Sequence, residues 1–186
     1  AETVKPYYYQ VYLAEHDVVA ELAPTERAAA FRLTYPEKEM SYLVVDAYSG
    51  GNAEVIGDRN MIVGYSTANH GGVTENFRNW FVVVSDTPFE TQTVDGHIAM
   101  VGFKTVKGQK VNLKVASSFI SQEQAELNLN ELSGRSFDEI AEAGRARWNE
   151  VLGRIAVEDD NLDNLRTFYS CLYRSVLFPR DLSEIN

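Results

Sequence analysis

Residues 136–155 constrain the fold more than any other stretch, because the apolar pattern differs on its two sides. Within this stretch apolar side chains recur every three or four residues, which is the pattern of an amphipathic helix. These apolar positions are Phe137, Ile140, Ala141, Trp148, Val151, Leu152 and Ile155. Ser136 and Glu139 have the spacing of a capping box, in which each side chain bonds a free backbone N–H, so we predict that the helix begins here.

A helix with a single apolar face needs another apolar surface to pack on. The large apolar surface that this sequence offers is the chain before residue 136. We therefore interpret residues 136–155 as a strut between two domains. An ordinary core helix of a single α+β domain is the alternative.

The chain before residue 120 consists of short strand-like runs separated by glycine, proline and asparagine. In these runs apolar and polar residues alternate, or β-branched and aromatic residues dominate. The runs are 7–13, 18–22, 28–35, 42–47, 53–56, 61–65, 79–85, 98–104 and 111–119. Evenly spaced strands without intervening helices predict an antiparallel β-sandwich.

The longest irregular segment, residues 66–76, is polar and contains a Gly-Gly pair. Long surface loops often carry binding residues, so this segment is the best candidate for a binding loop. Asn69 and His70 within it, and Trp80 in the strand that follows, are weak candidates for substrate binding. Aromatic residues on strands are more often core residues, which is the alternative for Trp80.

The apolar period becomes helical after residue 120. Ser121 and Gln124 have the spacing of a second capping box, which predicts a short helix over 121–132. A third helix is predicted over 162–178, ended by Pro179. Its apolar face is too broad to remain in water, so it needs a partner surface. The candidate domain-interface residues are Trp148, Tyr169, Tyr173 and Phe178.

Composition argues against several classes of protein. A formal net charge of −10 disfavours binding to nucleic acid or to an anionic membrane surface. The single cysteine, Cys171, supplies no disulfide framework, and its apolar helical context predicts a small core residue. No uncharged apolar run approaches the roughly 18 residues that cross a bilayer. The chain starts at Ala1 and ends in polar residues, so we expect a piece of a longer protein.

The sequence pattern indicates no catalytic group. His16, His70 and His97 lie in separate segments, without the spacing of a metal site. No serine lies in a Gly-x-Ser-x-Gly turn, and no glycine-rich phosphate loop is present. Surface or strand-end roles are the simpler interpretation of the three histidines.

Acidic pairs near turns are the remaining candidates, because hydrolysis of a glycosidic bond uses two carboxylates. The pairs are Glu15 with Asp17 and Glu21 with Glu26. Arg27 and Arg32 flank an alanine-rich strand nearby. We expect these arginines to pair with the carboxylates, which leaves the acids with solvated, structural roles.

Several separated segments carry a family resemblance. They are YYYQVYL, VVAELAPTERAAAFRLTYP, GYSTANHGGVTENFRNWFVVVSDTPF, SFISQEQAELNLNEL with ARWNEVLGRI, and FYSCLYRSVLFPR. Within the second segment the matching positions are Ala20, Glu21, Leu22, Thr25, Arg27, Phe31, Tyr35 and Pro36. In this order, and over nearly the whole chain, they resemble the N-terminal part of glycoside hydrolase family 92.

The resemblance implies a mainly β fold. It implies an antiparallel β-supersandwich of the galactose mutarotase-like kind over residues 1–132, incomplete at its start. Residues 133–160 would form a helical linker, and 161–186 would hold the first helix of a catalytic (α/α)6 barrel, truncated here.

The resemblance also implies a calcium-dependent exo-α-1,2-mannosidase that removes terminal mannose with inversion, in N-glycan degradation, in the periplasm or outside the cell. The family motifs that hold the catalytic acid, the base and the calcium lie beyond this chain. We therefore assign no catalytic or metal-binding residue here and expect the isolated chain to be inactive. The expected partners are mannose-containing glycans, the protein's own C-terminal helical domain and, for the isolated chain, further copies of itself.

Two other functions remain open at this point. One is a non-catalytic carbohydrate-binding sandwich that uses Trp80, the first-strand tyrosines and residues 66–76. The other is a structural module that only docks a helical domain.

Overall fold

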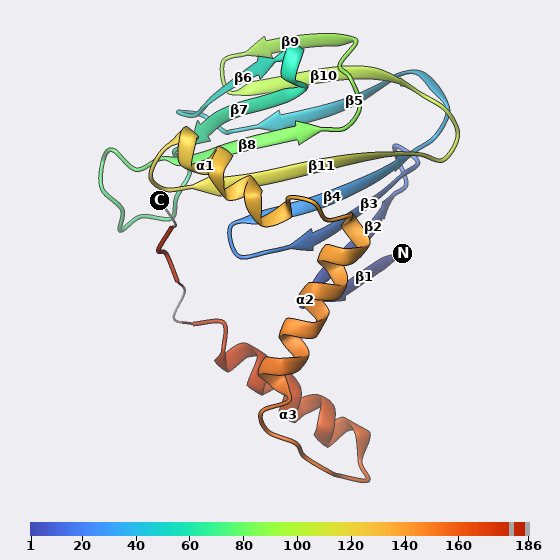
Figure 1. Ribbon diagram of the computed structural model, residues 1–186, viewed down its shortest axis with the longest axis vertical. Coiled ribbons are helices and arrows are strands. Elements are labelled where there is room, and N and C mark those ends of the chain that lie inside the picture. Colours follow the sequence, from blue (N-terminus) through green and yellow to red (C-terminus); the bar gives the residue numbers. More distant parts are fainter. Residues whose placement is uncertain (179–180, 185–186) are drawn as a thin grey trace.

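The computed structural model describes residues 1–178 and 181–184 (Figure 1). Strands form the first two thirds of the chain and helices the last third. The elements are β1 (Glu2–Lys5), β2 (Tyr8–Leu13), β3 (Val18–Pro24), β4 (Ala28–Tyr35), β5 (Lys38–Asp46), β6 (Asn52–Ile56), η1 (Gly57–Arg59), β7 (Met61–Ser66), β8 (Asn79–Ser85), β9 (Thr91–Asp95), β10 (Ile98–Thr105), β11 (Gln109–Ser118), α1 (Gln122–Asn128), η2 (Leu129–Leu132), α2 (Phe137–Leu152) and α3 (Leu162–Ser175).

The strands make two sheets. The larger has eight strands in the order β1-β2-β3-β4-β11-β8-β7-β6, and the smaller has three in the order β5-β10-β9. All neighbouring strands in both sheets are antiparallel. The predicted antiparallel sandwich followed by helices is therefore confirmed.

Two apolar cores lie on opposite faces of the larger sheet. The core between the sheets contains Val18, Leu33, Tyr35, Ala53, Ile62, Val83, Ala99, Val101, Phe103, Val111 and Leu113. The core between the larger sheet and the helices contains Ala23, Ala28, Ala30, Met61, Val63, Val82, Ala116, Ala125, Leu132, Phe137 and Ile140. Side chains alternate across a strand, so β4 contributes to both cores.

The helix side of β4 carries small residues. Ala28 and Ala30 are buried there, and Arg32 follows on the same face two residues later. Alanine leaves room for the helical segments to approach the sheet, where Leu132, Phe137 and Ile140 belong to the same core. The alanine-rich sequence of this strand is thus explained by close packing against η2 and α2.

Two strands were not predicted from the sequence. β1 and β9 are four and five residues long, and all but one of their residues are exposed. A strand at the edge of a sheet, without an apolar face, has no periodic signal. Each gets its structure from hydrogen bonding to a longer neighbour, β2 or β10.

Helix α2 begins where predicted. The Ser136 N–H donates to Glu139 Oε2 at 2.8 Å, and the Glu139 N–H donates to Ser136 Oγ at 3.3 Å, so the capping box is complete. Phe137 and Ile140 in its first turn are buried, whereas Ile155, beyond its end, is exposed. Only the first turns lie on the sandwich and the rest projects beyond it, as a strut does (Figure 1). The division into domains at residues 132 and 160 stays a prediction.

An ionic cluster attaches α2 to the sheet. Arg32 on β4 donates from Nε and Nη2 to the carboxylate of Glu21 on β3, both at 2.7 Å. Its Nη1 donates to Asp138 in the first turn of α2 at 2.9 Å, and its guanidinium lies 4.2 Å from the centre of the Phe137 ring. The prediction that Arg32 pairs with a nearby carboxylate is confirmed, but the expectation that this acid is solvated is wrong, because Glu21 is buried.

A tyrosine completes this cluster. Tyr8 on β2 donates its hydroxyl proton to Glu21 at 2.8 Å. The hydrogen bonds from Arg32 keep the pKa of Glu21 below its usual range, although burial alone would raise it. Burial and the Glu21 carboxylate raise the pKa of Tyr8 to about 12. Near pH 7 the cluster is therefore a carboxylate held between a guanidinium and a neutral phenol.

Helix α3 differs from its prediction. It covers Leu162–Ser175, so it ends before Phe178, and Pro179, which was expected to end it, lies outside the described residues. No residue within α3 is buried. The prediction of Cys171 as a core residue is wrong, because Cys171 is exposed on α3. Within the part of the chain that the structure describes, no helix has the length and apolarity needed to span a membrane.

The Glu21–Arg32 pair should contribute strongly to stability. The side chains are only 9% and 16% exposed, so Glu21→Gln would leave a buried guanidinium with only the exposed carboxylate of Asp138 as a counter-charge. We expect the free energy of unfolding to fall by about 3 kcal/mol. Chemical denaturation of the purified chain measures it.

The matched control is Glu150→Gln. Glu150 pairs with Arg147 on α2, and both side chains are more than 60% exposed. An exposed pair of this kind should change stability by less than about 0.5 kcal/mol. Equal effects of the two substitutions would contradict the role of the buried pair.

Candidate functional site: the cleft between sandwich and helices

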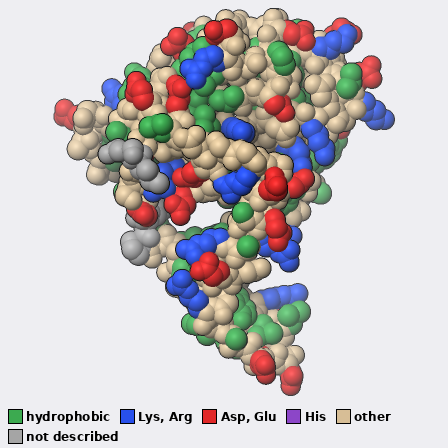
Figure 2. Space-filling model, viewed as in Figure 1, with side chains coloured by type: hydrophobic (Ala, Val, Ile, Leu, Met, Phe, Trp, Pro, Cys, Tyr) green, Lys and Arg blue, Asp and Glu red, His purple; other side chains and the backbone are tan. Residues whose placement is uncertain are grey.

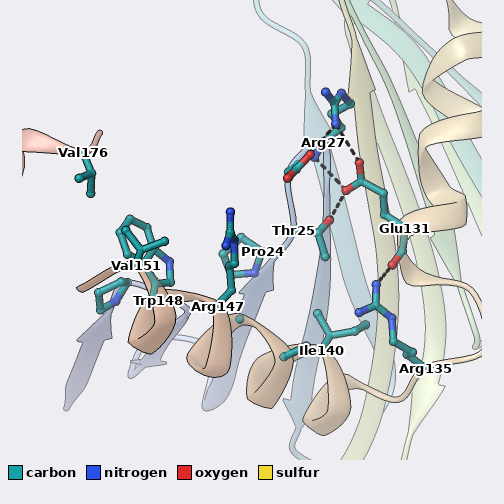
Figure 3. A pocket seen from close by; sticks show the side chains of 14 residues that line it. Pro24, Thr25, Arg27, Glu131, Arg135, Ile140, Arg147, Trp148, Val151 and Val176 are labelled. Atoms are coloured by element: carbon teal, nitrogen blue, oxygen red, sulfur yellow. Dashed lines mark hydrogen bonds and ion pairs between the residues drawn. The ribbon is translucent and has the colours of Figure 1, made fainter. Parts of the chain in front are cut away.

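An open cleft of about 660 Å³ lies between the sandwich and the helices. The β3–β4 turn and η2 form one side, α2 forms the floor, and Val176 after α3 lies at the far end (Figure 3). Figure 2 shows the same hollow between the sandwich and the projecting helices. Its walls differ in chemistry, one polar and one apolar.

Glu131 of η2 organises the polar wall. Its Oε2 accepts a hydrogen bond from the Thr25 hydroxyl at 2.6 Å and from the Arg27 N–H at 3.0 Å. Its Oε1 accepts from Arg27 Nη1 at 3.4 Å, and its backbone oxygen accepts from Arg135. Figure 3 shows Thr25 and Arg27 of the turn directed at this carboxylate.

The hydrogen bonds determine the charge state of Glu131. Burial acts to raise the pKa of this carboxyl, but donation from Thr25 and Arg27 outweighs it and the pKa is lowered. A carboxylate that already accepts three hydrogen bonds and is held ionised is poorly suited to protonate a leaving group. Glu131 is therefore a structural anchor of the turn.

The apolar wall lies along α2. Ile140, Trp148 and Val151 line it, and Pro24 faces them from β3. Near the middle of the helix, Gly144 touches the chain between β1 and β2: an added Cβ would lie 3.1 Å from Tyr7 Cβ. The helix can lie this close to the strands because residue 144 has no side chain.

The structure brings together part of the predicted domain interface. The rings of Trp148 and Tyr173 are 5.0 Å apart and join α2 to α3. The Tyr169 hydroxyl donates to the Ile155 carbonyl at 3.2 Å, which fixes the connection between the two helices. Phe178 lies beyond α3 and is 68% exposed. Whether these residues meet another domain stays a prediction.

The predicted substrate-binding residues do not converge. Asn69 and His70 are exposed in the loop between β7 and β8, and Asn69 bonds within the loop, to Thr67 and Gly71. Trp80 is half-buried, and its ring packs on Tyr65 with the centroids 4.9 Å apart. In the part of the chain that the structure describes, no contact or cleft joins Trp80 to the two loop residues. Their role in binding stays a prediction.

The described residues do not form a metal site. Among residues 1–178 and 181–184, no group of three or more His, Cys, Asp and Glu side chains is arranged to hold an ion. The buried carboxylates are already bound to arginine, as in the pairs of Glu21 and Glu131. These residues do not fit a calcium ion.

The polar wall was not predicted as a unit. Arg27 was expected to pair with a nearby acid and does so, with Glu26 at 2.9 Å, but Glu131 was not identified. Glu131 follows Arg27 by 104 residues, so no local pattern connects them. The available signal was weak: a Thr-x-Arg turn that supplies a hydroxyl, a backbone N–H and a guanidinium together.

Comparisons with known proteins add the family context. The model of the glycosyl hydrolase family 92 N-terminal domain matches residues 1–130, and that of the family 92 catalytic domain matches residues 124–186. A curated relative, an uncharacterized secreted glycosidase of Arthroderma benhamiae, is 32% identical over 82 residues, which is 41% of this chain and 11% of that protein.

Solved structures match the whole chain. A GH92 inverting mannosidase of Bacteroides thetaiotaomicron superposes with a TM-score of 0.91 at 36% identity, over 100% of this chain and 27% of that one. A GH92 α-mannosidase of the same organism gives 0.81 at 24% identity, over 98% of this chain and 28% of that one. The chain thus spans little more than a quarter of the length of these structures.

The Glu131 anchor predicts a specific dependence on pH. A lowered pKa gives stability that is complete above about pH 4.5, the value in the unfolded chain, and is lost as the pH falls through the folded pKa. Glu131→Gln should therefore lower the free energy of unfolding by about 2 kcal/mol at pH 7, and much less once the pH has fallen below the lowered pKa of the folded state.

Denaturation at a series of pH values measures this difference. Glu142→Gln is the control, because Glu142 is exposed on α2 and pairs only with Arg145 among the described contacts. A Glu131→Gln effect that does not change with pH would contradict the assignment.

Proposed function

The chain belongs to glycosyl hydrolase family 92, and from this premise we propose that it is the N-terminal part of an exo-acting α-1,2-mannosidase. The proposed enzyme releases terminal mannose from glycans with inversion. The observation that carries the proposal is the match of the whole chain to an inverting mannosidase at 36% identity and a TM-score of 0.91.

The proposed chemistry needs two carboxyl groups about 6.5–9.5 Å apart, with water between one of them and the sugar. The buried carboxylates described here are engaged by arginine and hydroxyl groups, in the Glu21 and Glu131 clusters. We therefore assign the catalytic acid and base to the remainder of the parent protein. We assign the calcium ligands there as well, because the described residues do not fit that ion.

The proposed role of this chain is to support the catalytic domain. The family 92 catalytic-domain match begins at residue 124, ahead of α2 and α3. The apolar residues of α3 are at most half-buried, and the apolar wall of the cleft continues onto Trp148 and Val151 of α2. We propose that further helices of the parent protein pack on this surface.

The proposed location is outside the cell or in the periplasm, and the proposed substrates are N-glycans with terminal mannose. The support for location is the description of the Arthroderma benhamiae relative as secreted. A carbohydrate-binding or purely structural module is the alternative. The half-buried position of Trp80, with its ring T-shaped to that of Tyr65, does not favour it, because only part of the ring is left for a sugar.

The proposal predicts a division of activity. The parent protein should release mannose from an α-1,2-linked mannobiose, and calcium chelation should abolish the release. Proton NMR should detect β-mannose as the first product, because inversion of an α-linkage gives the β-anomer. The isolated 186-residue chain should release none.

Two outcomes would contradict this division. Release of mannose by the isolated chain would place the active site within it. Binding of mannose oligosaccharides by the isolated chain in titration calorimetry, at millimolar affinity or tighter, would favour the carbohydrate-binding alternative. A chain inactivated by misfolding is recognised by its circular dichroism.

The isolated chain should also self-associate. Leu162 and Val176, at the two ends of α3, are 57% and 41% exposed, and the edge strand β5 exposes Tyr42 and Val44. Apolar surface of this kind favours contact with a second copy. Sedimentation velocity should show association that increases with concentration.

Leu162→Lys combined with Val176→Lys should weaken this association at least severalfold, because it charges both ends of the α3 surface. Val73→Lys is the control, since Val73 is similarly exposed, at 44%, in the loop between β7 and β8. A monodisperse monomer at all concentrations would exclude self-association.

A further inference from the structure

Residues 181–184 lie against the sandwich, although they follow α3, which lies beyond it (Figure 1). The carboxylate of Asp181 shapes this segment by accepting from the Ser183 N–H at 2.9 Å and from its hydroxyl at 2.6 Å. The segment therefore has a defined turn and presents Ser183 and Glu184 to the sandwich.

Arg27 makes the first contact. Its Nε donates to the Ser183 carbonyl at 2.8 Å, and its Nη2 donates to the same oxygen. The guanidinium is already oriented by Glu26 and Glu131, and its side chain is only 14% exposed. An arginine held in this way loses little conformational freedom when it binds the carbonyl.

Glu184 makes the second contact. Its Oε1 accepts from the Phe119 N–H at 2.9 Å, directly after β11, and its Oε2 accepts from Asn128 Nδ2 at 2.9 Å. Asn128 is 6% exposed and is held in place by the Ser117 carbonyl, at 2.8 Å, and by Gln124. Hydrogen bonds from Ser118, Phe119 and Asn128 outweigh burial and lower the pKa of Glu184.

We propose that residues 181–184 form a clasp that holds the helical part to the sandwich at a second point. The first point is Arg32 bound to Asp138 at the start of α2. The clasp binds the β3–β4 turn, the end of β11 and α1 at once. Two separate attachments prevent α2 and α3 from pivoting about the first one. This inference does not depend on the proposed mannosidase activity.

Hydrogen–deuterium exchange of the full-length parent protein, read by mass spectrometry, tests the clasp. Glu184→Ala should raise exchange by about tenfold in the peptide that contains Phe119, because the Phe119 N–H loses its acceptor. Asn128→Ala should raise it less, because Glu184 then keeps its bond to Phe119. Exchange should also rise in α3 and in residues 153–161, which the clasp restrains from a distance. In these two regions the double variant should exceed Glu184→Ala by little, since that variant already frees Glu184 from both partners.

Glu158→Ala is the matched control, because Glu158 is exposed in the connection between α2 and α3. Thermal unfolding verifies that each variant remains folded. Exchange equal to that of the control in all peptides would overturn the clasp. A rise confined to the Phe119 peptide, with α3 unchanged, would overturn its role in holding the helices.

Discussion

The Glu21–Arg32 pair is the interaction on which the relation between sheet and helices depends. The two residues are directly opposite each other on β3 and β4, on the face that α2 covers. Burying a charge is costly unless it is paired, and here each partner satisfies the other with two hydrogen bonds. The same guanidinium also binds Asp138 and lies over Phe137. The arginine that balances the buried charge of Glu21 therefore also fixes where α2 begins.

Two arginines, one on strand β4 and one in the turn before it, thus position the helical layer on the sheet. Arg27 and Arg32 are five residues apart, about 17 Å along an extended chain. The alanines between them allow η2 and α2 to lie close to the sheet, so both guanidinium groups reach partners beyond it. A strand with larger residues in place of Ala28 and Ala30 would lift the helices and separate these ion pairs.

Sequence periodicity predicted the elements that carry an apolar face and failed for those that carry none. The eight residues of β4 and the capping box of α2 carry their own signals, alternation in one and a Ser-x-x-Glu spacing in the other. β1 and β9 have no such signal, because each forms only by pairing with a neighbouring strand, β2 or β10. Cys171 was misplaced because an apolar helical pattern predicts burial without showing whether a partner is present. The contact of Glu131 with Arg27 joins residues 104 positions apart, and the contacts of Glu184 join residues 56 and 65 positions apart. Local sequence patterns do not predict contacts between residues so far apart.

The way this chain uses its buried acids agrees with a supporting role in a larger enzyme. Glu21, Glu131 and Glu184 each accept several hydrogen bonds and have lowered pKa values. A general acid needs the opposite environment, one that raises its pKa toward the working pH and leaves one face open to substrate. Buried acids that are held ionised and fully bonded give rigidity instead. A rigid sandwich joined to α2 by charged contacts is suited to support the helical domain that we propose to carry the reacting groups.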